Sequence, residues 1–273
     1  VTMTTKDHEY FDSIEAAEEV SIDQEQRAWY VATRDADFAG AEEKMWQEYP
    51  STPDEAFQKS TEGCYYTAQL TAARKEKRIC RLPTLMNVPC LTFWDIGNSD
   101  GCAIWVLQRV GHENRWIRFY EAWNEPYSHA VKWMKDTGLI FEKHYLPHDA
   151  DHVRQGQTTN KSPKQMLEEL LPGSKFEIVE RIQDVNWGIQ QTRDAFPTYF
   201  FDEEHCKAGI IHAESYRKKW NTRQGCWSDE PSKEGGHSEA ADSLRQHGQA
   251  LAAGLIQTSG QNWKRKTTNW RTT

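Results

Sequence analysis

Polar and apolar positions in the first part of the chain are spaced as in amphipathic helices, and start signals for helices occur at several places. The run Ser21-Ile22-Asp23-Gln24 fits a capping box, in which two side chains satisfy free backbone amides, and it predicts a helix through Ala32. Thr52-Pro53-Asp54-Glu55 repeats this pattern with proline in the first helical turn. A further helix with a basic end is expected over residues 67–77. We therefore expect a mostly helical segment over residues 1–88.

After this segment the pattern changes to short apolar runs bounded by proline and glycine, which is typical of strands. Residues 92–96 lie between Pro89 and Gly97 and predict a buried strand that carries the acid Asp95 near its end. Two further strands are expected to follow after short turns, at residues 101–110 and 115–123. Three consecutive strands joined in this way make a meander, with Asp95 at one rim.

The rest of the chain mixes predicted helices with strands. The expected helices are residues 128–145, 163–171, 185–195 and 202–220, and a last helix that begins near His237 and contains Asp242. A strand is expected over residues 176–181, and a short extended segment ends in the acids Asp149 and Asp151. Consecutive strands followed by strands alternating with helices predict an α/β fold with a mixed sheet flanked by helices.

Two prolines within residues 81–89 (RLPTLMNVP) mark the strongest domain junction in the sequence. We expect the helical segment over residues 1–88, a sheet-containing domain over residues 89–256 and a basic tail over residues 257–273. Four basic residues and no acid occur in this tail: Lys264, Arg265, Lys266 and Arg271. A solvated tail explains this composition best, and a tail that grips DNA or a partner protein is the alternative.

The formal net charge of −8 argues against a protein that simply coats nucleic acid, because such proteins match the phosphate backbone with positive charge. It leaves nucleic acid open as a substrate, since acids gathered in a metal site add negative charge that bound cations offset. Six cysteines without metal-ligand spacing predict free thiols in a reducing compartment. No stretch has the composition of a secretory leader or a bilayer-spanning run, so we expect a soluble, intracellular protein.

Three acids fall where strand ends or a covering helix can bring them together: Asp95, Asp149 and Asp242. Mg²⁺ prefers hard oxygen ligands and keeps several waters, so a few carboxylates and a substrate phosphate complete its shell. Two such ions about 4 Å apart can activate a water and stabilise the leaving oxygen of a phosphodiester. Spacing alone leaves a second interpretation open, in which each acid caps a helix or closes a turn, because the chain has 41 acids.

A phosphate-binding loop for ATP is not expected in this chain. Residues 156–162 (GQTTNKS) imitate such a loop, but they lack its second glycine and are one residue too short. A loop that leads into an N-capped helix explains this run better. The sequence therefore predicts no ATPase site.

Four runs of residues resemble segments of the tailed-phage terminase large subunits. The run YPSTPDEAF at residues 49–57, preceded by MWQE, resembles the segment that links the two enzymatic domains of that family. FWDIG at residues 93–97 resembles the first metal-binding strand of its nuclease domain, and LPHDA at residues 146–150 resembles the second acidic motif. AADSLR at residues 240–245 resembles the helix that carries the third acid. The resemblance extends roughly from residue 21 to residue 245.

The resemblance implies an RNase H-like nuclease domain of a viral genome-packaging terminase, which cuts concatemeric double-stranded DNA. It implies two divalent cations, Mg²⁺ or Mn²⁺, with Asp95 bridging both ions and Asp149 and Asp242 holding one each. It also implies the terminase small subunit and the portal of the procapsid as partners, and the host cell cytoplasm as the location. Residues 1–88 then correspond to the end of the ATPase half and the linker.

The chain departs from the family before the third acid. Many relatives have Ser-His in front of the final Ala-Ala-Asp, whereas this chain has Ser238-Glu239, with a histidine one step earlier at His237. Glu239 shares a helix face with Asp242, and we favour a solvated neighbour over an additional ligand. Asp151 and Glu121 are further candidates beside the ligands. The candidate DNA-binding residues are basic, although a solvated surface explains them equally well: Lys161, Lys164, Lys264, Arg265 and Lys266.

Two other functions stay open from the sequence. The run His148-Asp149-Ala150-Asp151-His152 concentrates imidazoles and carboxylates, as in a zinc hydrolase, although no second histidine cluster completes a site. Alternatively, the domain is a non-catalytic module that grips DNA and docks on the portal, and its acids are structural.

Overall fold

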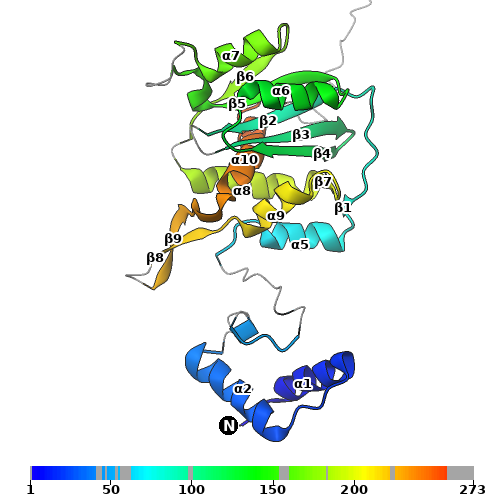
Figure 1. Ribbon diagram of the computed structural model, residues 1–273, viewed down its shortest axis with the longest axis vertical. Coiled ribbons are helices and arrows are strands. Elements are labelled where there is room, and N and C mark those ends of the chain that lie inside the picture. Colours follow the sequence, from blue (N-terminus) through cyan, green and yellow to red (C-terminus); the bar gives the residue numbers. More distant parts are fainter. Residues whose placement is uncertain are drawn as a thin grey trace, which may run out of the picture. The chain divides into compact units, whose positions relative to one another are not determined.

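The computed structural model describes the chain in several stretches: residues 2–40, 45–46, 48–52, 55, 63–97, 101–153, 160–182, 184–221 and 225–256. Contacts within the chain divide it into two compact units, Val1–Glu62 and Gly63–Thr273 (Figure 1). The basic tail expected over residues 257–273, with Lys264, Arg265 and Lys266, lies outside the described residues.

The first unit contains the helices α1 (Thr5–Glu18) and α2 (Gln24–Asp37). Helix α2 confirms the helix expected near residue 21, but its cap is Asp23 and not Ser21. The Asp23 carboxylate accepts a hydrogen bond from the Gln26 amide at 2.8 Å, and the Gln26 side chain accepts one from the Asp23 amide at 3.0 Å. The prediction was two residues early because both registers of the chain offer a capping residue with glutamine three positions later.

Glu55 ties the segment around residues 49–57 to the helices of the first unit. The Glu55 amide donates to Thr52 Oγ1 at 3.2 Å, so the expected cap is present. The Glu55 carboxylate accepts hydrogen bonds from the Ser51 amide at 2.6 Å and from the Tyr10 hydroxyl at 2.7 Å. The Tyr10 hydroxyl of α1 in turn lies 3.0 Å from that of Tyr30 in α2. Other members of the run lie outside the described residues: Pro53, Asp54, Ala56 and Phe57.

The second unit is built on a seven-stranded sheet with the order β1-β7-β4-β3-β2-β5-β6. These strands are β1 (Ile79–Cys80), β2 (Cys90–Ile96), β3 (Cys102–Val110), β4 (Glu113–Ala122), β5 (Phe141–Pro147), β6 (Phe176–Val179) and β7 (Tyr199–Asp202). Strands β2, β3 and β4 form the expected meander, and β3 is antiparallel to both neighbours. The other neighbouring strands of this sheet are parallel. A mixed sheet of this order, flanked by helices, is RNase H-like, so the expected fold class is confirmed.

Helices cover both faces of the sheet (Figure 1). One face is covered by α8 (Val185–Ala195), α9 (Lys207–Ser215) and α10 (Ser238–Ala252). The other is covered by α6 (Tyr127–Asp136) and α7 (Pro163–Leu170). Successive residues of β2 face opposite sides, so Phe93 packs with the first group and Trp94 with the second. Burial on both faces explains the nearly continuous apolar run of this strand.

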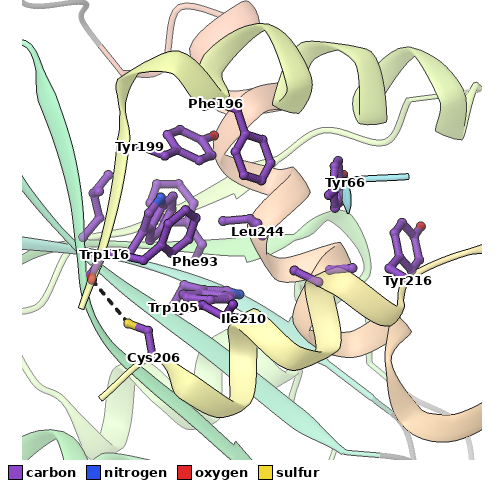
Figure 2. Close-up of a cluster of buried hydrophobic side chains, with 14 of the residues drawn as sticks. Tyr66, Phe93, Trp105, Trp116, Phe196, Tyr199, Cys206, Ile210, Tyr216 and Leu244 are labelled. Atoms are coloured by element: carbon purple, nitrogen blue, oxygen red, sulfur yellow. Dashed lines mark hydrogen bonds between the residues drawn. The ribbon is translucent and has the colours of Figure 1, made fainter. Parts of the chain in front are cut away.

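Large aromatic side chains fill the core between β2–β4 and the first group of helices. Figure 2 shows Phe93, Trp105 and Trp116 gathered on the sheet beside Leu244 of α10, and all four are fully buried. A Cβ atom on Gly209 would lie 2.5 Å from the Trp105 ring, so α9 can approach the sheet this closely only because residue 209 is glycine. The Trp105 indole N–H donates to the Ala240 carbonyl at 2.8 Å. This hydrogen bond anchors the start of α10, which carries Asp242.

The helix expected over residues 128–145 is wrong in its second half. Helix α6 ends at Asp136, and Gly138 follows with a φ of 67°, a left-handed conformation that glycine adopts easily. The chain then forms β5, which pairs in parallel with β2. Polar and apolar residues in β5 are spaced in a way that fits both the helical and the strand period. The parallel pairing with β2 determines that this segment is a strand.

The single helix expected over residues 202–220 is also wrong. The chain forms β7, a turn, α9 and then the strand β8 (Lys218–Asn221), which pairs with β9 (Cys226–Pro231) in a separate two-stranded sheet. The buried Asp202 carboxylate accepts hydrogen bonds from the Leu82 amide at 2.9 Å and from the His205 amide at 2.8 Å. Asp202 therefore stabilises the turn after β7, at the position where the expected helix would have begun.

The second unit begins at Gly63, earlier than the junction expected near residue 89. Helix α5 (Thr67–Lys75) contributes the buried Leu70 to the same core as Phe93, and β1 pairs in parallel with β7 at the edge of the sheet. The prolines before β2 therefore lie in a connection within the unit. The helical composition of residues 63–77 concealed this, because composition does not reveal which core a helix joins.

All six cysteines are free thiols. Within the described stretches, none of the helices combines the length and the apolar composition needed to cross a bilayer.

Candidate functional site

Asp95, Asp149 and Asp242 line one pocket with a volume of about 360 Å³. Asp95 is the penultimate residue of β2, and Asp149 lies in a 3₁₀ turn, His148–Asp151, directly after β5. Because β2 and β5 are parallel neighbours, their ends meet at the same edge of the sheet. Asp242 reaches this edge from α10, which packs across β2 and β3. The structure thus brings together the three acids that the sequence singles out.

Strand register places Asp95 on the face that α8, α9 and α10 cover. Asp95 pairs with Ala103 of β3, and Ala103 pairs with Glu121 of β4, so the three side chains share this face. Phe93 precedes Asp95 by two residues on the same face and lies in the apolar core. Along this face of β2, the apolar Phe93 is therefore followed directly by the acidic Asp95.

The surroundings of Asp95 disfavour its charged form. Burial raises the pKa of Asp95 well above its usual value, and the charges of Asp242, Glu239 and Asp149 raise it further. The positive charge of Arg245 acts in the opposite direction but does not cancel these effects. At neutral pH the pocket therefore favours a proton or a bound cation at Asp95.

Asp242 is held by two donors from different segments of the chain. The Tyr216 hydroxyl donates to Asp242 Oδ1 at 3.2 Å, and Arg245 Nη2 donates to the same oxygen at 2.9 Å. Tyr216 is almost fully buried, and burial raises its pKa far above the ordinary value, so it stays a neutral donor. The carboxylate of Asp242 is therefore oriented before any ligand binds.

Glu239 lies one helical turn before Asp242 and is partly buried. Its Oε2 atom is inaccessible to solvent and has no hydrogen-bond partner within the part of the chain that the structure describes. A buried carboxylate oxygen without a donor is unfavourable unless a cation or a water satisfies it. Glu239 is thus not the solvated neighbour that the sequence favoured.

The structure separates Asp149 from Asp151. Asp149 lines the pocket, whereas the Asp151 side chain is 57% exposed and lies 3.8 Å from Lys164 Nζ. Lys161, the other basic candidate in this region, forms an ion pair with Glu169 at 2.6 Å. Asp149 is therefore the acid of this turn that can act in the pocket.

Glu121 and His237 are joined through a residue that the sequence did not single out. His212 Nε2 lies 2.9 Å from Glu121 Oε2, and His212 Nδ1 lies 2.8 Å from His237 Nδ1. These three side chains connect β4, α9 and the residue before α10. They hold the start of α10 in place and do not line the pocket.

The chemistry of the pocket fits a hard divalent cation. Among the described residues, no group of three or more His, Cys, Asp or Glu side chains is placed to hold a metal ion as it stands, and this includes the turn after β5 considered for zinc. Mg²⁺ does not need such a cage, because one or two carboxylates, waters and a substrate phosphate complete its octahedron. The raised pKa of Asp95 means that a nearby positive charge would stabilise its charged form, and the buried Glu239 Oε2 lacks a donor among the described residues.

The sequence does not mark Tyr216 or Gln246 as members of the site, and it contains Arg245 in the run AADSLR without indicating its role. Arg245 follows Asp242 by three residues, a spacing that places both on one helix face, so this signal was available. Tyr216 and Gln246 gave no such signal. The Gln246 side-chain amide donates to the Trp94 carbonyl of β2, and this contact joins α10 to the sheet beside Asp95. Both depend on chain segments that meet only in the folded protein.

No family model and no curated protein matches the chain. Several solved structures are similar to it, among them the large terminase of a thermophilic bacteriophage, with 12% identity and a TM-score of 0.48 over 65% of this chain and 43% of that chain. The P22 large terminase nuclease domain has 14% identity and a TM-score of 0.46 over 65% and 89%. The nuclease domain of g2p, the large terminase of bacteriophage SPP1, with bound Mn, has 9% identity and a TM-score of 0.43 over 58% and 84%. The chain spans less than half the length of the first of these three proteins.

Proposed function

We propose that this chain contains the nuclease of a terminase-type large subunit, a metal-dependent endonuclease that hydrolyses phosphodiester bonds of double-stranded viral DNA. The observation that carries this proposal is the meeting of Asp95, Asp149 and Asp242 in one pocket, from three segments far apart in the sequence. The motifs around these acids support the same family. Divalent cations, Mg²⁺ or Mn²⁺, are the cofactors that the donor set suits.

Each acid has a distinct task in this proposal. Asp95 would be shared between two ions, and Asp149 and Asp242 would each hold one of them, because all three acids line the same pocket. When bound, the two ions supply an activated water and stabilisation of the leaving oxygen. Tyr216 and Arg245 orient Asp242, and the Asp95 carboxylate must be free of its proton to take part. No side chain acts as a nucleophile.

Two basic side chains at the wall of the pocket are suited to hold the DNA backbone. Arg181 and Lys233 both line the pocket and are exposed. Contacts of this kind position the phosphates but carry no sequence information. We therefore expect weak sequence preference. Lys161 and Lys164 bind neighbouring acids and rank behind this pair as DNA contacts.

The larger assembly is also part of the proposal. The unit Val1–Glu62, with the run at residues 49–57, corresponds to the end of the ATPase half and the linker, and the second unit corresponds to the nuclease domain. The terminase small subunit and the portal are the expected partners, and the host cell cytoplasm is the expected location. No ATPase activity is expected from this chain.

Metal-dependent nicking of supercoiled plasmid tests the nuclease directly. The full chain, stripped of ions with EDTA, is expected to cut after addition of Mn²⁺ or Mg²⁺. Replacing Asp95, Asp149 or Asp242 with Asn preserves shape and removes charge, so each variant is expected to lose cutting while its circular dichroism spectrum is unchanged. Asp194→Asn is the matched control, because Asp194 is an exposed acid of α8 that accepts a hydrogen bond from Gln190.

The alternatives give different results in the same assay. If Asp95→Asn cuts as well as the wild type, the acids are structural and the domain is a non-catalytic DNA-gripping module. If activity returns with Zn²⁺ alone and with neither Mn²⁺ nor Mg²⁺, the zinc hydrolase is correct. Strong discrimination among naked DNA sequences contradicts the expected weak preference.

A further inference from the structure

Arg245 places a guanidinium among the carboxylates of the pocket. Its Nη2 atom lies 2.9 Å from Asp242 Oδ1, and its side chain is only 14% exposed. Its Nε atom is buried and has no hydrogen-bond partner among the described residues. Burying a guanidinium with an unsatisfied donor is unfavourable unless nearby negative charges compensate its positive charge.

The packing of α8 against α10 holds this side chain in place. A Cβ atom on Gly188 would lie 3.2 Å from Arg245 Cδ, so glycine at this position leaves the space that the Arg245 stem occupies. The Thr192 hydroxyl of α8 also lies 3.5 Å from the Arg245 carbonyl oxygen. The Gly188 side of α8 therefore lies against the Arg245 stem, and the Thr192 contact fixes the Arg245 backbone. The charged end contacts Asp242.

Arg245 binds the carboxylate that also serves a divalent ion in the proposed function. Within the described part of the chain, the hydrogen bonds to Asp242 come from Tyr216 and Arg245, and both reach Oδ1. The other oxygen, Oδ2, is left for a cation. An ion that binds there meets the positive charge of Arg245 at close range, in a site where burial strengthens charge interactions.

We propose that Arg245 is a built-in counter-cation, which neutralises part of the acidic pocket when no divalent ion is bound and weakens the binding of such ions. Arg245 thereby sets the ion concentration at which the pocket fills. It is a positioning residue that acts through Asp242. The inference rests on the proposed function, because it requires that the acids bind divalent ions.

Titration of the full chain with Mn²⁺ tests this inference without measuring cutting. Free Mn²⁺ is followed by its electron paramagnetic resonance signal at one fixed pH. Arg245→Gln removes the charge, and it is expected to bind Mn²⁺ about tenfold more tightly than the wild type, within the usual range of coupling between two sites. The metal-free variant is expected to melt at a lower temperature, so that Mn²⁺ raises its melting temperature by more. Arg245→Lys keeps the charge and is expected to stay near the wild-type affinity.

A matched control separates the local charge from the net charge. Arg193→Gln removes an arginine of α8 whose Nε donates to the Tyr65 carbonyl at 2.9 Å, outside the pocket. This variant is expected to bind Mn²⁺ as the wild type does. If Arg245→Gln does not fold, Arg245→Met keeps the aliphatic stem against Gly188 and removes the same charge.

The possible outcomes distinguish the two proposals. If Arg245→Gln binds Mn²⁺ as well as or more weakly than the wild type and melts at a lower temperature, Arg245 does not act as a counter-cation. Its ion pair with Asp242 is then purely structural. In that case the proposed function still stands if the wild type binds Mn²⁺ and Asp242→Asn does not. If the wild type binds no Mn²⁺ at all, the proposed function and this inference fail together.

Discussion

Phe93 and Asp95 lie two residues apart on the same face of β2, in opposite surroundings. The Phe93 ring is stacked on Tyr145 with 4.9 Å between the ring centroids, and it meets Trp116 edge to face at 5.7 Å. Asp95 instead faces other carboxylates, which raise its pKa. Neighbours in the core stabilise one another, whereas neighbours in the pocket are unfavourable until a proton or cation arrives. The rigid core around Phe93 is what holds the acids together.

The largest expected effect is on the core side of this comparison. Phe93→Ala removes a fully buried ring from a densely packed aromatic cluster and leaves a cavity. We expect the free energy of unfolding to fall by about 3–5 kcal/mol, measured by urea denaturation. Phe93→Leu fills most of the space and is expected to lose clearly less. Equal losses for the two variants contradict tight packing at this position.

A buried histidine in the same core makes stability depend on pH. His247 is fully buried against Phe93 and Trp116, its Nδ1 lies 2.6 Å from the Tyr199 hydroxyl, and burial lowers its pKa to about 3. The unfolded chain has a histidine pKa of about 6.5 and so binds the proton first. The contribution of neutral His247 is complete above this pH and is lost as the pH falls, by about 2 kcal/mol at pH 5.

Urea denaturation at several pH values measures this dependence. Between pH 6 and pH 5, the unfolding free energy of the wild type is expected to decrease more steeply than that of His247→Gln, by about 1 kcal/mol per pH unit. The variant need not match the wild type in absolute stability, because the slopes are compared. Parallel slopes would show that His247 is not buried in its neutral form.

On the pocket side, a substitution is expected to raise stability. Asp95→Asn removes a carboxyl group whose charged form burial and the surrounding acids disfavour, so the metal-free variant is expected to be about 1 kcal/mol more stable at pH 7. Because the folded-state pKa of Asp95 is raised, the wild type loses stability as the pH rises through the range above the unfolded value of about 3.9, and Asn removes this loss. If metal-free Asp95→Asn unfolds at a lower urea concentration than the wild type, the charged form of Asp95 does not destabilise the metal-free protein.

The smallest effect is expected at the acid that faces away from the pocket. Asp151→Asn breaks only an exposed 3.8 Å contact with Lys164, so its unfolding free energy is expected to change by less than about 0.5 kcal/mol. Asp149→Asn, two residues earlier, is the comparison, because it is expected to weaken Mn²⁺ binding while Asp151→Asn does not. Equal effects of the two changes on Mn²⁺ binding would contradict the assignment of Asp149.

Local patterns predicted the central strands well. The meander of β2, β3 and β4 and the helices α7, α8 and α10 agree with the expected elements, because apolar spacing is a strong signal over short distances, as are the side-chain caps of α7 and α8. The pattern failed for β5 and for the region from β7 to β8. In both places the segment fits two structures locally, and pairing with a distant strand decides between them.

The amino-acid sequence by itself determined the strand that carries Asp95 and the meander that follows it, because these depend on residue type and local period. Spacing left the three acids with a second interpretation, and the resemblance of four runs to a known family selected these acids and the RNase H-like fold. The tertiary structure decided which acid of the turn after β5 faces the pocket, and that Glu239 is buried with an unsatisfied oxygen. It also decided that Tyr216 and Arg245 meet at one oxygen of Asp242. The physical reason is that burial and charge interactions depend on distances between segments far apart in the chain, which no local pattern encodes.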